Sequence, residues 1–249
     1  QPTQAGYWLT LGALQLELRQ PKDAESSLQR YLQTAAAQPE QAAAASDDDE
    51  EQDTFAEGGR TQAWLMLAQA AELRGDGKAA AGWLDKIDDP QRALEVQTRR
   101  ATLLAKQGKL KEARALVQQV PERKPEDARA KLIAESQVLR EVKRWPDAHA
   151  VLVSANDRFP SDIDLLYEQA MMAEKISRMD EMERVLRRVL ELKPDHHHAY
   201  NALGYSLAER NQRLPEARDL IAKAVELAPN DPFIADSLGW VEFRLGNNA

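Results

Sequence analysis

The chain has 249 residues, of which 43% are hydrophobic and 6% aromatic, and its lack of cysteine excludes disulfides, thiolate zinc sites and cysteine nucleophiles. The net charge is −8, and six negative charges lie between Asp47 and Asp53, so that the rest of the chain is nearly balanced at −2. Because nucleic-acid binding needs a basic stripe that releases counterions, this charge distribution argues against a nucleic-acid partner.

Stretches rich in Ala, Leu, Glu, Gln and Arg predict helix along almost the whole chain. In residues 1–36, large and small apolar residues recur at a spacing that places them on one face of each of two helices. These residues are Trp8, Leu11, Gly12, Ala24, Leu28 and Tyr31. We therefore predict a first helical hairpin in this region.

Residues 37–60 interrupt the helical pattern with a low-complexity and strongly acidic sequence. Such a composition cannot bury enough apolar surface to offset the conformational entropy of the chain, so we predict disorder here. An EF-hand calcium loop is excluded, because no glycine stands at the sixth loop position and no correctly spaced glutamate closes the loop. We interpret the segment as a solvated spacer, with a docking tail for a basic partner as the alternative.

A repeat of about 34 residues runs through residues 61–246. Prolines recur at positions 125, 160, 194 and 229, at spacings of 35, 34 and 35 residues. We divide the region into hairpins at about 61–93, 94–127, 128–162, 163–196 and 197–231, followed by a single helix at 232–246. The most regular copy carries Tyr200, Leu203, Gly204, Leu207, Ala217, Ile221, Ala224 and Pro229.

This pattern resembles the tetratricopeptide repeat, a unit of two helices with an aromatic residue, a Leu-Gly pair, two alanines and a closing proline. The resemblance implies an all-α fold, a right-handed α-solenoid of about six full hairpins plus one extra helix. Small residues such as Gly12 and Gly204 are expected to let the two helices of a hairpin approach closely. Three copies depart from the pattern, with Gln15, Gln97 and Gln169 at positions that are normally apolar.

The sequence contains no pattern typical of a catalytic, cofactor or metal site. No P-loop, G-x-G-x-x-G, G-x-S-x-G or H-E-x-x-H motif is present. Three consecutive histidines, at 196–198, fall in a turn between hairpins, where successive side chains point in different directions. We therefore do not expect them to meet at one ion. The prediction is no catalytic residue, no metal ligand, no cofactor, and a protein that is not an enzyme.

In tetratricopeptide arrays the first helix of each hairpin lines a concave groove that holds a protein or peptide partner. Transferring the groove positions to this sequence implies seven partner-binding residues: Tyr167, Met171, Asn201, Tyr205, Phe233, Trp240 and Phe243. For Trp240 and Phe243, packing against a second helix of the last hairpin is the alternative. Of the Lys/Asn set that chaperone-binding members use, only Asn201 partly matches, which argues against a carboxylate clamp.

Residues 200–247 show a narrower resemblance, through the segments ALGYSLAER, EARDLIAKAVELAPNDP and DSLGWVEFRLG, to the C-terminal repeats of Gram-negative tetratricopeptide lipoproteins. This resemblance implies a periplasmic protein whose full-length form is anchored to the outer membrane. It also implies an adaptor that activates a periplasmic carboxyl-terminal processing protease and delivers substrates to it. A cytoplasmic location is the alternative.

We therefore predict a non-enzymatic scaffold or adaptor that holds a partner protein, such as a periplasmic protease or its substrates, in its concave surface. The alternatives are a cochaperone-like module that takes one extended peptide, and the regulatory region of a larger enzyme. The chain begins at Gln1 and ends inside a helical pattern, so we expect it to be part of a longer protein. No apolar run approaches the roughly 20 residues that span a bilayer, so we expect no membrane contact by this part.

Overall fold

The computed structural model describes residues 5–37 and 49–247, and for residues 36–37 and 49–57 the backbone alone. Within these residues the chain forms 13 helices and no strand, which confirms the predicted all-α fold. The helices are α1 (Ala5–Glu17), α2 (Pro21–Ala37), α4 (Asp49–Leu73), α5 (Gly77–Leu84), α6 (Ala93–Lys106), α7 (Leu110–Gln118), α8 (Pro125–Glu141), α9 (Trp145–Arg158), α10 (Ile163–Lys175), α11 (Met179–Leu192), α12 (His197–Glu209), α13 (Leu214–Leu227) and α14 (Pro232–Leu245).

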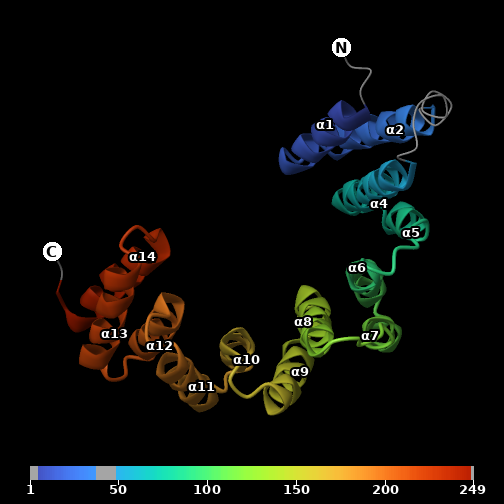
Figure 1. The fold of residues 1–249 in the computed structure, drawn as a ribbon. Coiled ribbons are helices and arrows are strands. Elements are labelled where there is room, and N and C mark those ends of the chain that lie inside the picture. Colours follow the sequence, from blue (N-terminus) through green and yellow to red (C-terminus); the bar gives the residue numbers. More distant parts are fainter. Residues whose placement is uncertain (1–4, 38–48, 248–249) are drawn as a thin grey trace. The chain divides into compact units, whose positions relative to one another are not determined.

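The helices form two compact units, Gln1–Val120 and Pro121–Ala249. In the first unit the hairpins are α1–α2, α4–α5 and α6–α7, and in the second they are α8–α9, α10–α11 and α12–α13. Helix α14 packs against both α12 and α13. Within the second unit, the first helices of the hairpins and α14 lie on the inner side of the curve, and α9, α11 and α13 lie on the outer side (Figure 1).

The first helices of the last repeats begin where a side chain can accept hydrogen bonds from the first turn. Asp162, His196 and Asp231 precede α10, α12 and α14, and each accepts at least one backbone N–H of its helix. Such caps satisfy donors that have no partner inside the helix. The predicted unit starts at 163, 197 and 232 coincide with the first residues of these helices.

Helix α4 requires a correction of the predicted disorder in residues 37–60. It begins at Asp49, twelve residues before the predicted hairpin at 61–93, and Ala37 is the last residue of α2. Residues 38–48 lie outside the described part of the chain. Acidic residues at a helix start are favoured by the helix dipole, an effect of position that average composition does not contain.

Two glycines on first helices are sites of close helix approach, as predicted. A Cβ atom on Gly204 would lie 2.7 Å from Cγ1 of Ile221 and 2.8 Å from the carbonyl oxygen of Ala217, both on α13. A Cβ atom on Gly12 would lie 2.6 Å from Cγ of Leu28 on α2. Real side chains do not tolerate such distances, so these positions require glycine for the observed packing.

A buried polar network joins α9, α10 and α11 inside the otherwise apolar core of the second unit. The side chain of Gln169 accepts from Nδ2 of Asn156 at 2.8 Å and donates to Oε1 of Glu181 at 2.7 Å. The same carboxylate oxygen lies 2.8 Å from Nε2 of His149. Burial opposes the charged form of Glu181, but the hydrogen bonds from Gln169 and His149 outweigh it and lower the pKa of this carboxyl.

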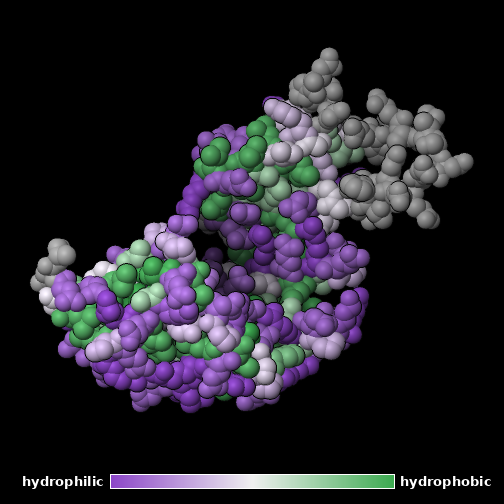
Figure 2. Space-filling view, turned by 60° about the vertical axis from the view of Figure 1, so that its left-hand side comes forward, coloured by the Kyte–Doolittle hydropathy of each residue, from purple (hydrophilic) through white to green (hydrophobic). Residues whose placement is uncertain are grey.

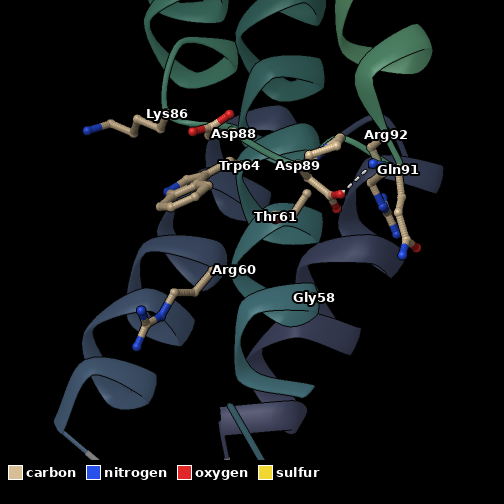
Figure 3. A pocket seen from close by; sticks show the side chains of 10 residues that line it. Gly58, Arg60, Thr61, Trp64, Lys86, Asp88, Asp89, Gln91 and Arg92 are labelled. Carbon is tan, nitrogen blue, oxygen red and sulfur yellow. Dashed lines mark hydrogen bonds between the residues drawn. The ribbon is translucent and has the colours of Figure 1, made fainter. Parts of the chain in front are cut away.

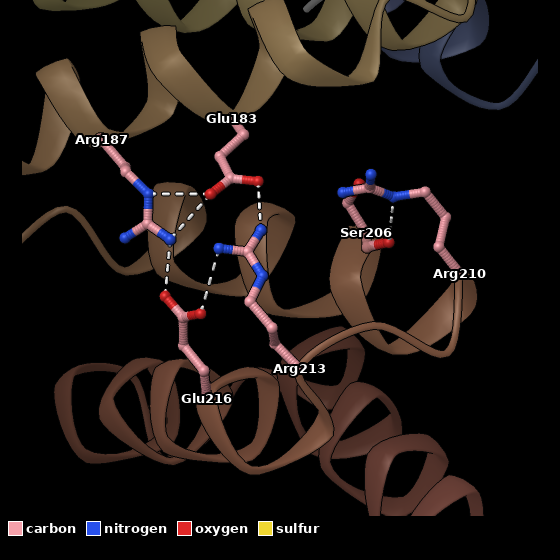
Figure 4. Close-up of polar contacts among 6 residues, drawn as sticks. All are labelled: Glu183, Arg187, Ser206, Arg210, Arg213 and Glu216. Carbon is pink, nitrogen blue, oxygen red and sulfur yellow. Dashed lines mark hydrogen bonds and ion pairs between the residues drawn. The ribbon is translucent and has the colours of Figure 1, made fainter.

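A second polar network connects two consecutive repeats through α11 and the start of α13 (Figure 4). Glu183 accepts from Arg187 at 2.9 Å and also pairs with Arg213. Glu216 in turn contacts Nη2 of Arg187 at 2.5 Å and Nη1 of Arg213 at 3.4 Å. The hydrogen bond from Arg213 is the largest cause that lowers the pKa of Glu183. Each carboxylate thus bridges two guanidinium groups and holds neighbouring hairpins together.

Candidate protein-binding surface

All seven predicted partner-binding residues lie on first helices of the second unit. Tyr167 and Met171 belong to α10, Asn201 and Tyr205 to α12, and the three remaining aromatic residues to α14. These helices line the inner side of the unit (Figure 1). The capped starts described above and the packing against α11 and α13 fix the orientation of each helix.

The strongest feature of this surface is a set of exposed aromatic side chains near the C-terminal end. Phe233 is 80% exposed, Phe243 is 57% exposed and Tyr205 is 39% exposed. Phe233, Trp240 and Phe243 are spaced by seven and three residues, which places them along one side of α14. Figure 2 shows apolar side chains at the surface of the second unit, bordered by polar ones. We call Tyr205, Phe233, Trp240 and Phe243 the aromatic surface.

Trp240 lies at the border between the aromatic surface and the core. Its ring stacks on Phe243 with centroids 5.6 Å apart, and the guanidinium of Arg244 lies 5.4 Å from its centroid. The other side packs against the cluster that contains Leu207 and Val241. The indole Nε1 is buried and has no hydrogen-bond partner among the described residues. Trp240 therefore supports the helix packing and also contributes to the surface.

The remaining predicted residues are less accessible than the aromatic ones. Tyr167 and Met171 are half-buried and pack against the core between α10 and α11. The ring of Tyr167 also stacks on His196, with centroids 5.1 Å apart, and burial raises the pKa of its hydroxyl. Asn201 is half-buried, and its side-chain oxygen is shielded from solvent and has no hydrogen-bond partner in the part of the chain that the structure describes. Among the seven predicted residues, the exposed apolar side chains therefore lie on α12 and α14.

The first unit contains a pocket of about 550 Å³ that the sequence did not indicate (Figure 3). One wall is the extended N-terminal part of α4, with Arg60 and Trp64, and the other is the connection from α5 to α6, with Lys86 and Asp88. The lining therefore mixes both signs of charge around one indole ring. A sequence-based search could not find it, because the repeat pattern does not show that the connection from α5 to α6 lies opposite this part of α4.

Comparisons with known proteins agree with the repeat architecture of the second unit. Residues 163–196 and residues 182–232 each match a family model for the tetratricopeptide repeat. Residues 163–232 therefore contain tetratricopeptide repeats. The matched residues include the hairpins α10–α11 and α12–α13, and thus most of the helices that carry the predicted binding residues.

A longer tetratricopeptide protein is similar in sequence. The TPR repeat-containing protein PA4667 of Pseudomonas aeruginosa is 34% identical over 183 residues, which are 74% of this chain and 31% of that protein. The chain therefore spans about a third of the length of this relative.

Solved structures with similar helical arrangements have low sequence identity. MamA from Desulfovibrio magneticus RS-1 has a TM-score of 0.46 and 18% identity, covering 70% of this chain and 97% of that chain. YrrB, described as a TPR protein with an unusual peptide-binding site, has a TM-score of 0.46 and 17% identity, covering 70% and 90%. Among the described residues of our chain, no helix is both long and apolar enough to cross a membrane.

Proposed function

We propose that this tetratricopeptide chain is a non-enzymatic scaffold or adaptor that holds a protein partner on the inner side of its second unit. The observation that carries the proposal is the aromatic surface on α12 and α14. Large and rigid apolar side chains that are exposed in a free protein are common anchors of protein interfaces. Single exposed apolar residues are common on protein surfaces and do not indicate binding. Here, however, the exposed Phe233 and Phe243 share helix α14 with the half-buried Trp240, and the ring of Phe243 stacks on that of Trp240.

We further propose that the partner is a periplasmic protease or its substrates, and that the full-length protein is periplasmic and anchored to the outer membrane. The support for this finer proposal is the likeness of residues 200–247 to the C-terminal repeats of Gram-negative tetratricopeptide lipoproteins. The mechanism would be recruitment. A scaffold that binds a protease and a substrate raises their effective concentration without contributing any chemistry.

The first experiment is capture of partners from a cell-envelope extract on the immobilised chain, followed by mass spectrometry and by affinity measurement with the purified partner. The informative variants are Phe233→Ala and Tyr205→Ala. If these residues are anchors, each variant should weaken binding by about fivefold or more, which corresponds to roughly 1 kcal/mol. Circular dichroism should show unchanged helix content, because both residues are exposed and neither belongs to the buried core.

The matched control is Tyr7→Ala, which removes a 54% exposed aromatic residue from α1 in the first unit. It should leave the affinity unchanged. Equal losses in Tyr7→Ala and Phe233→Ala would show that aromatic exposure in general, and not this surface, determines binding. Trp240→Ala is unsuitable as a test, because the loss of its core contacts would lower stability as well.

A further inference from the structure

Three metal-ligating side chains converge where α12 and α14 begin. His197 and His198 are the first two residues of α12, and Asp231 directly precedes α14. One potential ligand atom from each side chain lies within 4.8 Å of those from the other two. The two imidazole rings are themselves close, with centroids 4.1 Å apart. The packing of α12 against α14 brings together residues that are more than 30 positions apart in sequence.

The carboxylate of Asp231 is already oriented by the start of its helix. Its Oδ1 accepts from the backbone nitrogens of Phe233 at 2.9 Å and Ile234 at 3.3 Å. Both bonds use the same oxygen, so that Oδ2 remains without a hydrogen-bond donor among the described residues. Hydrogen bonds of this kind fix ligand orientation in metal sites, because a ligand held in place loses less entropy when the ion binds.

His196, the first histidine of the triplet, has a different role. Its Nδ1 accepts the backbone N–H of Ala199 at 3.1 Å, and its ring stacks on Tyr167. It therefore caps α12 and does not join the cluster. Two of the three consecutive histidines thus lie close together, and the third potential ligand comes from the residue before α14.

We propose that His197, His198 and Asp231 form a binding site for one divalent transition-metal ion, such as Zn²⁺, Ni²⁺ or Cu²⁺. Two imidazoles with one carboxylate suit these ions, whereas Mg²⁺ and Ca²⁺ prefer sets composed of oxygen. Around an ion with ligand bonds of about 2.0–2.1 Å, neighbouring ligand atoms are roughly 3.4 Å apart. Side-chain rotations would close the remaining distance, and water would complete the coordination.

The ion would connect the hairpin α12–α13 to α14 at the ends of their first helices. Because such a site exists only when both helices are packed, binding should favour the folded array over the unfolded chain. At a free ion concentration of 100 times Kd, the thermal midpoint should rise by roughly 5–10 °C.

The test is calorimetric titration of the chelator-treated chain with ZnCl₂, supported by the visible absorption spectrum of Co²⁺ as a report on nitrogen and oxygen ligation. We expect one ion per chain and no heat with MgCl₂. Asp231→Asn keeps a residue that caps helices well but removes the charge, and it should weaken Zn²⁺ binding about tenfold or more. His198→Asn should have an effect of similar size.

His196→Asn is the matched control, since it removes one imidazole from the same triplet and retains a capping side chain. It should leave the affinity for Zn²⁺ unchanged within about twofold. The proposal is overturned if Asp231→Asn binds as tightly as the unaltered chain, or if His196→Asn loses as much affinity as His198→Asn. Either result would mean that the ion binds the consecutive histidines alone, and not a site that joins His197 and His198 to Asp231.

Discussion

The close approach of α12 and α13 makes Gly204 the position where one added methyl group should have the largest effect. Substitution by alanine normally stabilises a helix interior by about 1 kcal/mol, because glycine has the higher conformational entropy when unfolded. At Gly204 this gain is opposed by sterics. The new Cβ would lie 2.7 Å from Ile221, 2.8 Å from the carbonyl oxygen of Ala217 and 3.2 Å from Cβ of Leu220.

The carbonyl oxygen decides the sign of the effect. A flexible side chain can rotate away from a new methyl group, but the backbone of α13 can move only together with the helix. Overpacking of a tight core costs about 1–3 kcal/mol, and the shift of α13 adds to this. We therefore expect Gly204→Ala to lower the free energy of unfolding of the second unit by about 1–2 kcal/mol after the helix-propensity gain is included.

Gly239 provides the matched comparison. It lies at the corresponding position of α14, it is exposed, and a Cβ atom there would have no neighbour within 4 Å. Gly239→Ala should therefore raise stability by about 0.5–1 kcal/mol. Urea unfolding followed by circular dichroism should move the transition midpoint in opposite directions for the two variants, by roughly half a molar unit for Gly204→Ala. If Gly204→Ala were as stable as Gly239→Ala, the helix spacing described here would be wrong.

The junction between α8 and α10 and the acid stability of the chain give two further tests. Asp162 caps α10, and its carboxylate also pairs with Nη2 of Arg129 at 3.1 Å. Asp162→Ala should therefore lower the free energy of unfolding in urea by about 1–2 kcal/mol. Asp162→Asn keeps a capping side chain and should lower it clearly less. The hydrogen bond from Arg129 lowers the pKa of Asp162, and that from Arg213 lowers the pKa of Glu183. A lowered pKa stabilises the folded chain at pH values above the unfolded-state pKa, and this contribution is lost as pH falls through the folded-state pKa. The thermal midpoint should therefore fall as pH is lowered below about 4, and a midpoint that does not change between pH 5 and pH 3 would contradict this assignment.

The repeat period was the part of the fold that could be predicted from sequence alone. The starts of α10, α12 and α14 follow from it, because the same spacing of small residues, caps and prolines recurs in each copy. The start of α4 could not be predicted in this way. A low-complexity acidic segment has no apolar stripe, and whether it extends a helix depends on end effects and on the neighbouring α2.

The exposure of the proposed binding residues could be predicted only in part, for a geometric reason. Register identifies which residues point away from the second helix of their own hairpin, and this is sufficient for the exposed Tyr205 and Phe233. Whether such a residue is accessible also depends on how closely the adjacent repeat packs. Tyr167 is half-buried against His196, the residue that caps the start of α12, and this contact depends on how α12 packs beside α10.

The glutamines at normally apolar positions show how much the environment of one residue type can differ. Gln169 is buried and makes hydrogen bonds with Asn156 and Glu181. Gln15 likewise accepts from the hydroxyl of Ser27 on the facing helix at 2.7 Å. The side-chain oxygen of Gln97 is buried and has no partner among the described residues. From sequence these three positions are the same departure from the repeat pattern, but physically they are not equivalent.

This difference leads to opposite expectations for the same substitution. Gln169→Leu should lower stability by about 1–3 kcal/mol, because Asn156 and Glu181 would each lose one hydrogen bond in the core. Gln97→Leu should raise stability by about 1 kcal/mol, since it removes a buried oxygen that lacks a partner and adds apolar contact in α6. Urea unfolding of both variants would decide. Destabilisation by Gln97→Leu as large as that by Gln169→Leu would mean that Gln97 also has a polar partner, and that polar pairing within hairpins is more general in this array than its structure indicates.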